Sequence, residues 1–228
     1  MNSSTRTDGK DNLESKVFRR LGRKTDEFEV FEHTHSERIA TLADEIAKLF
    51  CLASKDRQSL LGAALLHDLG EATMGRDYIK RPGTLTDEER LDLQRHPIIG
   101  EQEGAKCGGD RATQLIVRWH HEWWNGGGYP DALSREEIPL AARILRVADS
   151  YAAITDARPF RPAMSQEEAR QHMAGWAGIE FDPRIVKVLL SLGPLPELES
   201  FAASLNEAAA VGEVQPESDW NLFSSFSK

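Results

Sequence analysis

The amino-acid sequence predicts an all-α protein, a helical bundle without a substantial sheet. Apolar residues recur at α-helical spacing, and Thr or Ser is twice followed by Glu at the spacing of a capping box. No segment alternates apolar and polar residues as a half-buried strand does. A length of 228 residues fits one domain of ordinary size with extensions.

The first strongly periodic segment begins at Ser36. Its apolar residues share one helical face: Ile39, Leu42, Ala43, Ile46, Leu49 and Phe50. A second helix is predicted from Ser54 to Gly70, because glycine is common where a helix ends. His67 and Asp68 would then lie in its last turn.

Capping residues and helix-starting prolines mark the later helices. The starts and their end signals are Thr86 to His96, Pro97 to Gly108, Asp110 to His121, Ile138 to Ile154, Ser165 onward, and Asp182 through Leu189. We expect about seven helices in the bundle, since a buried polar site between helices needs ligands from several of them.

The ends of the chain differ in composition from its middle. Residues 1–32 are predicted to be a polar extension with room for one weakly amphipathic helix, and residues 195–228 an acidic tail. Both are expected outside the bundle, which would span residues 33–194.

Composition excludes several classes of protein. A hydrophobic fraction of 40% and a charged fraction of 29% are typical of globular domains. The net charge of −9 argues against binding to duplex nucleic acid. No apolar stretch is long enough to span a membrane, so a cytoplasmic location is expected.

Seven histidines fall mostly near helix ends and beside carboxylates. The pairs His67-Asp68 and His120-His121 combine nitrogen ligands with oxygen ligands, a mixture that suits Fe, Mn or Zn. A carboxylate can bridge two metals, and Asp68 is the candidate for that position.

Six motifs carry a resemblance to a known family. In chain order they are HSER from His35, HDLGE from His67, RPGTLTDEE from Arg81, HPIIG from His96, HHEWWNGGGYP from His120, and ARILRVADSYAAITDARPFR from Ala142. Together they resemble the HD-GYP family of cyclic di-GMP phosphodiesterases, a branch of the His-Asp metal-dependent phosphohydrolases. The resemblance covers residues 33–192.

The resemblance implies a site with two divalent metal ions, iron or manganese. One metal would be held by His35, His67, Asp68 and Asp149, and the other by Asp68, His96, His120 and His121. A hydroxide bridging the metals would attack the phosphorus, so that His67 and Asp68 serve catalysis. Glu122 would orient one of the adjacent histidines by accepting its second ring N–H.

The resemblance also implies a substrate-binding region. Its residues would be Gly128, Tyr129, Pro130, Arg158, Arg161 and Arg81. Tyr129 would contact a guanine face, and the arginines suit phosphate oxygens.

Two departures from the family pattern affect the site. Glu71 stands where relatives have a phosphate-binding lysine, and it could be an extra metal ligand, a partner for Arg81 or Arg158, or a repellent to an anion. Phe31 stands where a third metal would need a carboxylate, which favours two metals with Glu32 or Glu71 as the nearby alternatives.

The expected function is metal-dependent hydrolysis of cyclic di-GMP to pGpG, GMP or both. One alternative keeps the metals and changes the substrate to another cyclic dinucleotide or a nucleotide. The other is a non-catalytic module that binds cyclic di-GMP or a protein partner through the loop at Gly128–Pro130 or the C-terminal tail.

Overall fold

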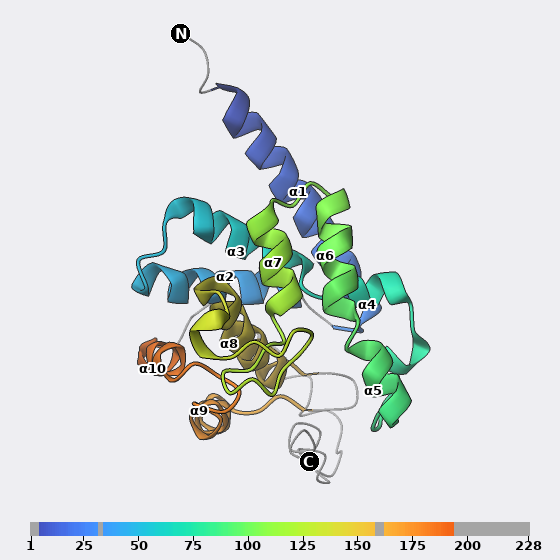
Figure 1. Cartoon of the computed structure of the whole chain (residues 1–228), viewed down its shortest axis with the longest axis vertical. Helices are drawn as coiled ribbons and strands as arrows, with labels where there is room; N and C mark the ends of the chain where they lie inside the picture. Colours follow the sequence, from blue (N-terminus) through green and yellow to red (C-terminus); the bar gives the residue numbers. More distant parts are fainter. Residues whose placement is uncertain (1–4, 32–33, 158–161, 194–228) are drawn as a thin grey trace, which may run out of the picture.

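The computed structural model describes residues 5–31, 34–157 and 162–193. These residues form ten α-helices and two short 3-10 helices (Figure 1). The α-helices are α1 (Thr5–Phe28), α2 (His35–Leu49), α3 (Ser54–Leu66), α4 (Leu69–Met74), α5 (Asp87–Leu93), α6 (His96–Lys106), α7 (Arg111–Trp119), α8 (Leu140–Thr155), α9 (Gln166–Gly175) and α10 (Pro183–Ser191). The 3-10 helices are Asp77–Ile79 and Arg135–Glu137.

The all-α prediction is confirmed. Within the described ranges the sole β-type pairing is an isolated bridge between Ala177 and Phe181. Three predicted caps are present: Thr86 and Ser165 form complete capping boxes, and Asp110 accepts a hydrogen bond from the Thr113 amide at 2.7 Å. These side chains satisfy amide groups that the first turn of a helix leaves without partners.

The core lies between α2, α3, α7 and α8, which pack against one another. The predicted apolar face of α2 is buried except at its end, where Leu49 is 56% exposed. From α8, Ile144, Leu145 and Ala148 face the same core and are fully buried. This apolar packing fixes the helices whose ends carry the histidines.

The expectation that residues 1–32 lie outside the bundle is wrong for the second half of α1. Phe18 is buried, and its ring would lie 3.2 Å from a Cβ added at Gly62 of α3. Asp26 accepts hydrogen bonds from the amide and hydroxyl of Ser36, at 3.2 and 2.9 Å. The polar composition concealed this because the helix attaches through few apolar residues and one buried carboxylate.

The prediction that one helix runs from Ser54 to Gly70 is also wrong. α3 ends at Leu66, His67 and Asp68 form a turn, and Gly70 lies inside α4. A Cβ at Gly70 would lie 2.0 Å from the carbonyl oxygen of His96, so this glycine permits close approach of α4 and α6. The residue that ends α4 is Gly75, which has φ of +60°.

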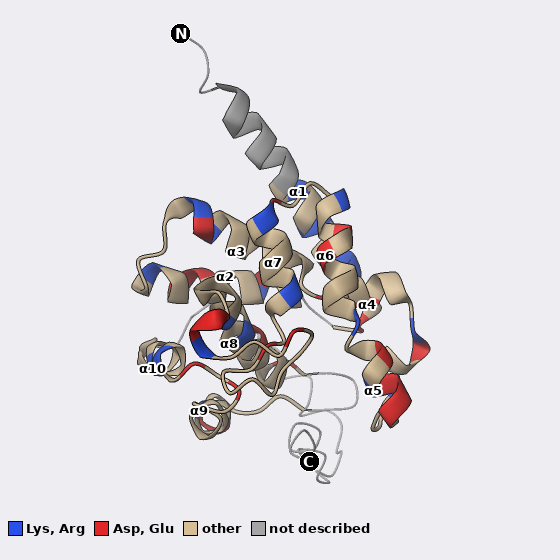
Figure 2. Ribbon diagram, viewed as in Figure 1, with Lys and Arg blue, Asp and Glu red and all other residues tan. Residues whose placement is uncertain are grey.

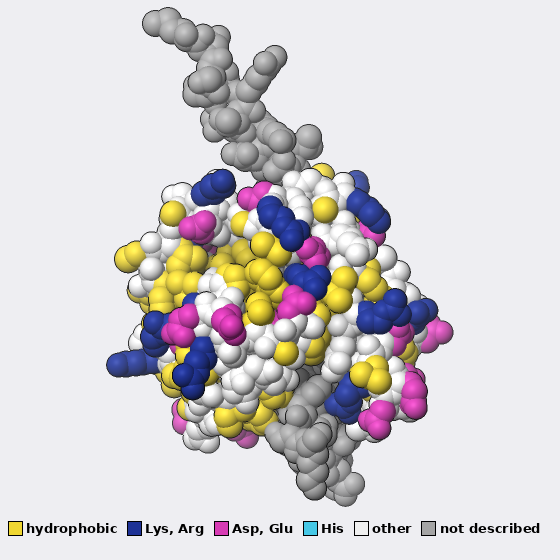
Figure 3. Space-filling model, in the orientation of Figure 1, with side chains coloured by type: hydrophobic (Ala, Val, Ile, Leu, Met, Phe, Trp, Pro, Cys, Tyr) yellow, Lys and Arg dark blue, Asp and Glu magenta, His cyan; other side chains and the backbone are white. Residues whose placement is uncertain are grey.

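The surface carries charges of both signs. On the face drawn in Figure 3, Lys and Arg side chains are interspersed with Asp and Glu side chains. Figure 2 shows an acidic first turn on α5, made by Asp87, Glu88 and Glu89. Among the described residues, none of the helices combines the length and the hydropathy that a membrane span requires.

Three groups of predicted residues lie outside the described ranges. They are Glu32, the phosphate-binding candidates Arg158 and Arg161, and the acidic tail of residues 195–228.

Candidate metal centre

The seven predicted metal ligands come from five places in the chain and meet in two groups. His35 begins α2, His67 and Asp68 form the turn after α3, His96 begins α6, His120 and His121 follow α7, and Asp149 lies in α8. One group contains Asp68, His96, His120 and His121, and the other contains His35, His67 and Asp149. Within each group the ligand atoms lie within 4.8 Å of one another.

Asp68 lies between the two groups, as a bridging carboxylate must. Its Oδ2 is 2.8 Å from Nε2 of His67, and its Oδ1 is 3.3 Å from Nε2 of His96. His67 in turn is 3.8 Å from Oδ1 of Asp149. The two groups therefore form one continuous centre.

Four histidines share a single ring orientation. Each directs Nδ1 outward to an oxygen that fixes the proton there: His35 to Asp156 at 2.6 Å, His67 to the Ala64 carbonyl at 3.0 Å, His96 to the Leu93 carbonyl at 2.8 Å and His120 to the Val117 carbonyl at 2.6 Å. A proton on Nδ1 leaves the Nε2 lone pair free to bind a metal. For the last three, the acceptor is the carbonyl three residues earlier, because each histidine lies at a helix end or start.

The donor set fits divalent metal ions. Nε2 of His67 and Oδ1 of Asp68 are buried, and neither makes a hydrogen bond of regular geometry among the described residues. Their near neighbours are other predicted ligands, Oδ2 of Asp68 for the first and Nε2 of His96 for the second. A bound cation would satisfy both atoms. Imidazole nitrogens with carboxylate oxygens are typical of Fe, Mn and Zn sites.

Without metal, protons partly balance the carboxylates. Burial disfavours a charged His67, yet the neighbouring Asp68 and Asp149 raise its pKa to about 10. Asp68 has its pKa held well below the usual value by His67, His120 and His96, against the effect of burial. Burial lowers the pKa of His96 to about 4. In the metal-free protein, the proton on His67 therefore supplies positive charge next to Asp68 and Asp149, which a bound metal ion would supply instead.

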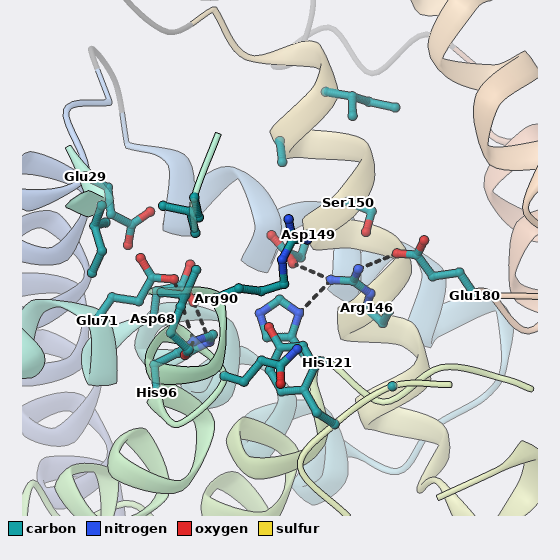
Figure 4. Close-up of a pocket in the computed structure, with 18 of the residues that line it drawn as sticks. Glu29, Asp68, Glu71, Arg90, His96, His121, Arg146, Asp149, Ser150 and Glu180 are labelled. Carbon is teal, nitrogen blue, oxygen red and sulfur yellow. Dashed lines mark hydrogen bonds and ion pairs between the residues drawn. The ribbon is translucent and has the colours of Figure 1, made fainter. Parts of the chain in front are cut away.

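A pocket of about 600 Å³ opens beside the centre (Figure 4). Ligands Asp68, His96, His121 and Asp149 contribute to its wall. Of the predicted substrate residues, Arg81, Gly128 and Tyr129 line it, whereas Pro130 is not among the described lining residues. The centre is thus accessible to a ligand of considerable size.

Tyr129 packs on the metal centre rather than standing free in the pocket. Its ring stacks on His121 with centroids 4.8 Å apart, and its amide donates to the His121 carbonyl at 3.1 Å. A Cβ at Gly128 would lie 2.3 Å from the Trp123 amide nitrogen, so glycine is required there. One face of Tyr129 is covered by His121, which restricts any base contact to its remaining surface.

The predicted role of Glu122 is wrong. Its carboxylate accepts hydrogen bonds from the amides of Asp131 at 2.7 Å and Leu133 at 3.0 Å. These bonds hold the segment after Pro130, and they occupy the oxygens that were expected to orient a histidine. The sequence placed Glu122 next to His121, but the chain turns after α7 and directs the carboxylate to the other side.

Arg81 and Glu71 both line the pocket. Arg81 forms a 2.5 Å ion pair with Glu89, so its charge is shared with α5. Oε1 of Glu71 lies 3.7 Å from Nδ1 of His96. Glu71 therefore adds negative charge next to a predicted ligand.

Sequence reasoning missed four residues at the site. Glu29, Arg146 and Glu180 line the pocket, and Asp156 orients His35. Arg146 could have been found, because it lies three residues before Asp149 and hence on the same face of α8. Glu29 and Glu180 are brought in from distant segments, and no local pattern marks them.

A family model described as HD domain matches residues 18–185. The chain belongs to the HD domain family. The predicted resemblance to the His-Asp phosphohydrolases is confirmed, and the match includes the second half of α1 that the sequence analysis had placed outside the domain.

This HD domain is similar to several curated proteins. It is 35% identical over 176 residues to the cyclic di-GMP phosphodiesterase response regulator RpfG of Xanthomonas campestris pv. campestris, covering 76% of this chain and 46% of the relative. It is 34% identical over 164 residues to 3'3'-cGAMP-specific phosphodiesterase 3 of Vibrio cholerae, covering 72% and 36% respectively. The chain thus matches less than half the length of these relatives.

Solved structures share the fold of this HD domain. A cyclic GMP-AMP specific phosphodiesterase of V. cholerae aligns with a TM-score of 0.64 at 20% identity, covering 88% of this chain and 54% of that one. The HD domain of PgpH from L. monocytogenes, in complex with cyclic di-AMP, aligns with a TM-score of 0.51 at 15% identity, covering 86% and 100%.

Proposed function

We propose that this HD domain hydrolyses the phosphodiester bonds of cyclic di-GMP, giving pGpG, GMP or both. The observation that carries the proposal is the meeting of seven ligand side chains in two groups around Asp68, at the wall of a pocket of about 600 Å³. Relatives named cyclic di-GMP phosphodiesterases support the substrate class.

Two divalent metals held by these residues would supply Lewis acidity toward the phosphoryl oxygens and an activated water as nucleophile. The donor set of imidazoles and carboxylates suits Fe, Mn or Zn, and the family resemblance favours Fe or Mn among these. The chain itself fixes the tautomers of His67, His96 and His120, positions Asp68 between the groups and packs the Tyr129 ring against His121. Arg158 and Arg161 are retained as phosphate-binding candidates.

A second candidate is the same chemistry on another cyclic dinucleotide. The observation favouring it is Glu71, which places a carboxylate on the pocket wall where the family pattern has a lysine. Relatives named 3'3'-cGAMP-specific phosphodiesterases match this chain over a comparable length. A change of charge at this wall alters which phosphate or base can lie against it.

The test is metal content together with turnover. Purified protein is loaded anaerobically with Fe(II) or Mn(II), metals per chain are counted, and hydrolysis of cyclic di-GMP, 3'3'-cGAMP and cyclic di-AMP is followed by chromatography. We expect two metals and release of pGpG or GMP from cyclic di-GMP. Asp68→Ala should lose both, whereas Asp56→Ala, at an exposed position of α3, should lose neither.

Each other outcome identifies an alternative. Faster hydrolysis of 3'3'-cGAMP or cyclic di-AMP would replace the substrate while keeping the chemistry. Two metals with no turnover of any of the three, but with binding of cyclic di-GMP, would identify a binding module. No bound metal would contradict the mechanism.

A further inference from the structure

Arg146 lies in the centre of the site and makes three polar interactions (Figure 4). Its Nη1 is 2.9 Å from Nδ1 of His121 and 3.5 Å from Oδ2 of Asp149. Its Nη2 pairs with the buried carboxylate of Glu180. The guanidinium is therefore anchored on one side by Glu180 and directed on the other toward predicted ligands of both groups.

His121 differs from the other four histidines of the centre. Their Nδ1 atoms donate to oxygens, whereas Nδ1 of His121 faces a guanidinium, which has only donors. Nδ1 of His121 must therefore accept, and in the neutral ring the proton lies on Nε2. Desolvation and the charges of His120 and Arg146 keep the pKa of His121 well below its usual value, in agreement with a neutral ring.

In this arrangement His121 has no lone pair available for a metal. Ligation through Nδ1 would use the lone pair that Arg146 occupies. Ligation through Nε2 would move the proton to Nδ1, where it would face an N–H of Arg146. Either way, His121 can become a ligand only if its hydrogen bond with Arg146 is broken.

The described lining of the pocket around Arg146 has more carboxylates than Lys and Arg side chains. Its described lining includes the carboxylates of Glu29, Asp68, Glu71, Asp149 and Glu180. The described Lys and Arg residues of the lining are Arg81, Arg90 and Arg146, and Arg81 is paired with Glu89. Nε of Arg146 is also buried without a hydrogen-bond partner. Arg146 is thus a lining cation in contact with the predicted ligands His121 and Asp149, and its Nε is a donor without an acceptor.

We propose that Arg146 binds a phosphate group of the substrate, with its Nη1 released for this purpose if His121 gives up the hydrogen bond in order to hold a metal. The released Nη1 requires an acceptor, and an anionic phosphodiester oxygen beside the metals is the matching one. Glu180 keeps the guanidinium in place during this exchange. Arg146 therefore supplies from α8 the phosphate-binding charge that Glu71 removes from α4. This inference rests on the proposed phosphodiesterase function.

The first experiment measures phosphate binding to the Mn(II)-loaded protein by calorimetry. The probes are a hydrolysis-resistant phosphorothioate analogue of cyclic di-GMP and inorganic phosphate, which lacks bases. Arg146→Gln/Glu180→Gln removes the cation without leaving Glu180 charged and unpaired, and Arg146→Lys keeps a charge. Arg111→Gln, which removes an exposed ion pair with Glu101, is the matched control.

We expect the double variant to bind two metals and to bind both probes about tenfold to a hundredfold more weakly, the range for losing a charged hydrogen bond. Arg146→Lys should lose less, and Arg111→Gln should match the wild type. Wild-type affinity for both probes in a folded double variant with two metals would overturn the inference. If inorganic phosphate binding depends on Arg146 while the cyclic di-GMP analogue does not bind the wild type, the proposed substrate fails and the inference stands.

The second experiment follows the His121 ring by ¹⁵N NMR. In metal-free protein its Nδ1 should show the shift of an unprotonated nitrogen, and loading with diamagnetic Zn(II) should change that pattern. Metal-free Arg146→Gln/Glu180→Gln should also lose the wild-type pattern. A His121 spectrum that is unchanged on Zn(II) loading, at two metals per chain, would overturn the exchange.

Discussion

At the residue scale, the hydrogen-bond partner of Nδ1 determines the tautomer and the ring orientation of each histidine of the centre. For His67, His96 and His120 that partner is a carbonyl three residues earlier. Such a contact joins residues only three positions apart, so it depends on the local course of the backbone. For His35 the partner is Asp156, 121 residues away, and for His121 it is Arg146. These two partners depend on how α8 packs, and sequence reasoning did not find them.

The pKa of His67 gives a prediction for metal binding. Because its pKa is about 10 without metal, His67 carries a proton at neutral pH that must leave before Nε2 can bind a cation. The metal-free protein thus holds the extra proton, and raising the pH favours the metal-bound form. Metal affinity should increase by about tenfold per pH unit below the pKa for this one proton.

The measurement is a competition titration of Mn(II) against a chelator of known affinity between pH 6 and 8, with proton release followed in two buffers of different ionisation enthalpy. Proton release on loading should be close to one per chain from this group. Affinity that is independent of pH over this range would show that His67 is neutral in the metal-free protein.

At the element scale, the decisive feature is the contact between α4 and α6. The sequence identified Gly70 as a helix end, since glycine is common there, but its function is to admit the His96 carbonyl. α3 instead ends early, at Leu66, and places His67 and Asp68 in a turn directed into the centre. No local signal distinguishes these two uses of glycine, because only the approach of a second helix makes the difference.

Gly70→Ala should therefore destabilise the protein. A Cβ 2.0 Å from the His96 carbonyl oxygen forces α4 away from α6, at a cost of about 3 kcal/mol for an overpacked contact. Because His96 and Asp68 flank that contact, metal content should also fall. Urea unfolding and metal analysis of the purified variant measure the two effects.

The matched control is Gly175→Ala in α9, where no heavy atom lies within 4 Å of an added Cβ. Its free energy of unfolding should equal that of the wild type or exceed it slightly. Equal stability of the Gly70 and Gly175 variants would show that α4 can move without cost.

At the scale of the whole molecule, the centre joins five segments of the chain. Ligands from α2, the turn between α3 and α4, α6, the segment after α7, and α8 meet at Asp68. Two bound metal ions would link all of these segments. Metal binding should therefore increase the free energy of unfolding of the domain. For a free metal concentration a thousand times the Kd, the gain for one site is about 4 kcal/mol.

Removal of metal should consequently lower the melting temperature. At roughly 2–4 °C for each kcal/mol in a chain of this length, a chelator should lower the melting temperature measured by calorimetry by roughly 8–16 °C for one site. Asp68→Ala, which removes the shared ligand, should melt at the same temperature with and without chelator. A wild-type protein whose melting temperature is unaffected by the chelator would contradict a stabilising metal centre.

The sequence by itself determined the helical class and the helix caps at Thr86, Asp110 and Ser165, which follow from local spacing. Through its motifs and the family that they resemble, it also implied the set of seven residues that meet at the centre. Tertiary structure alone decided that α1 joins the domain through Phe18 and Asp26. It also decided that Glu122 accepts hydrogen bonds from the loop at Asp131 and Leu133, and that Arg146 forms a hydrogen bond with Nδ1 of His121. These depend on contacts between segments far apart in the chain, and such contacts are set by packing, which no local pattern encodes.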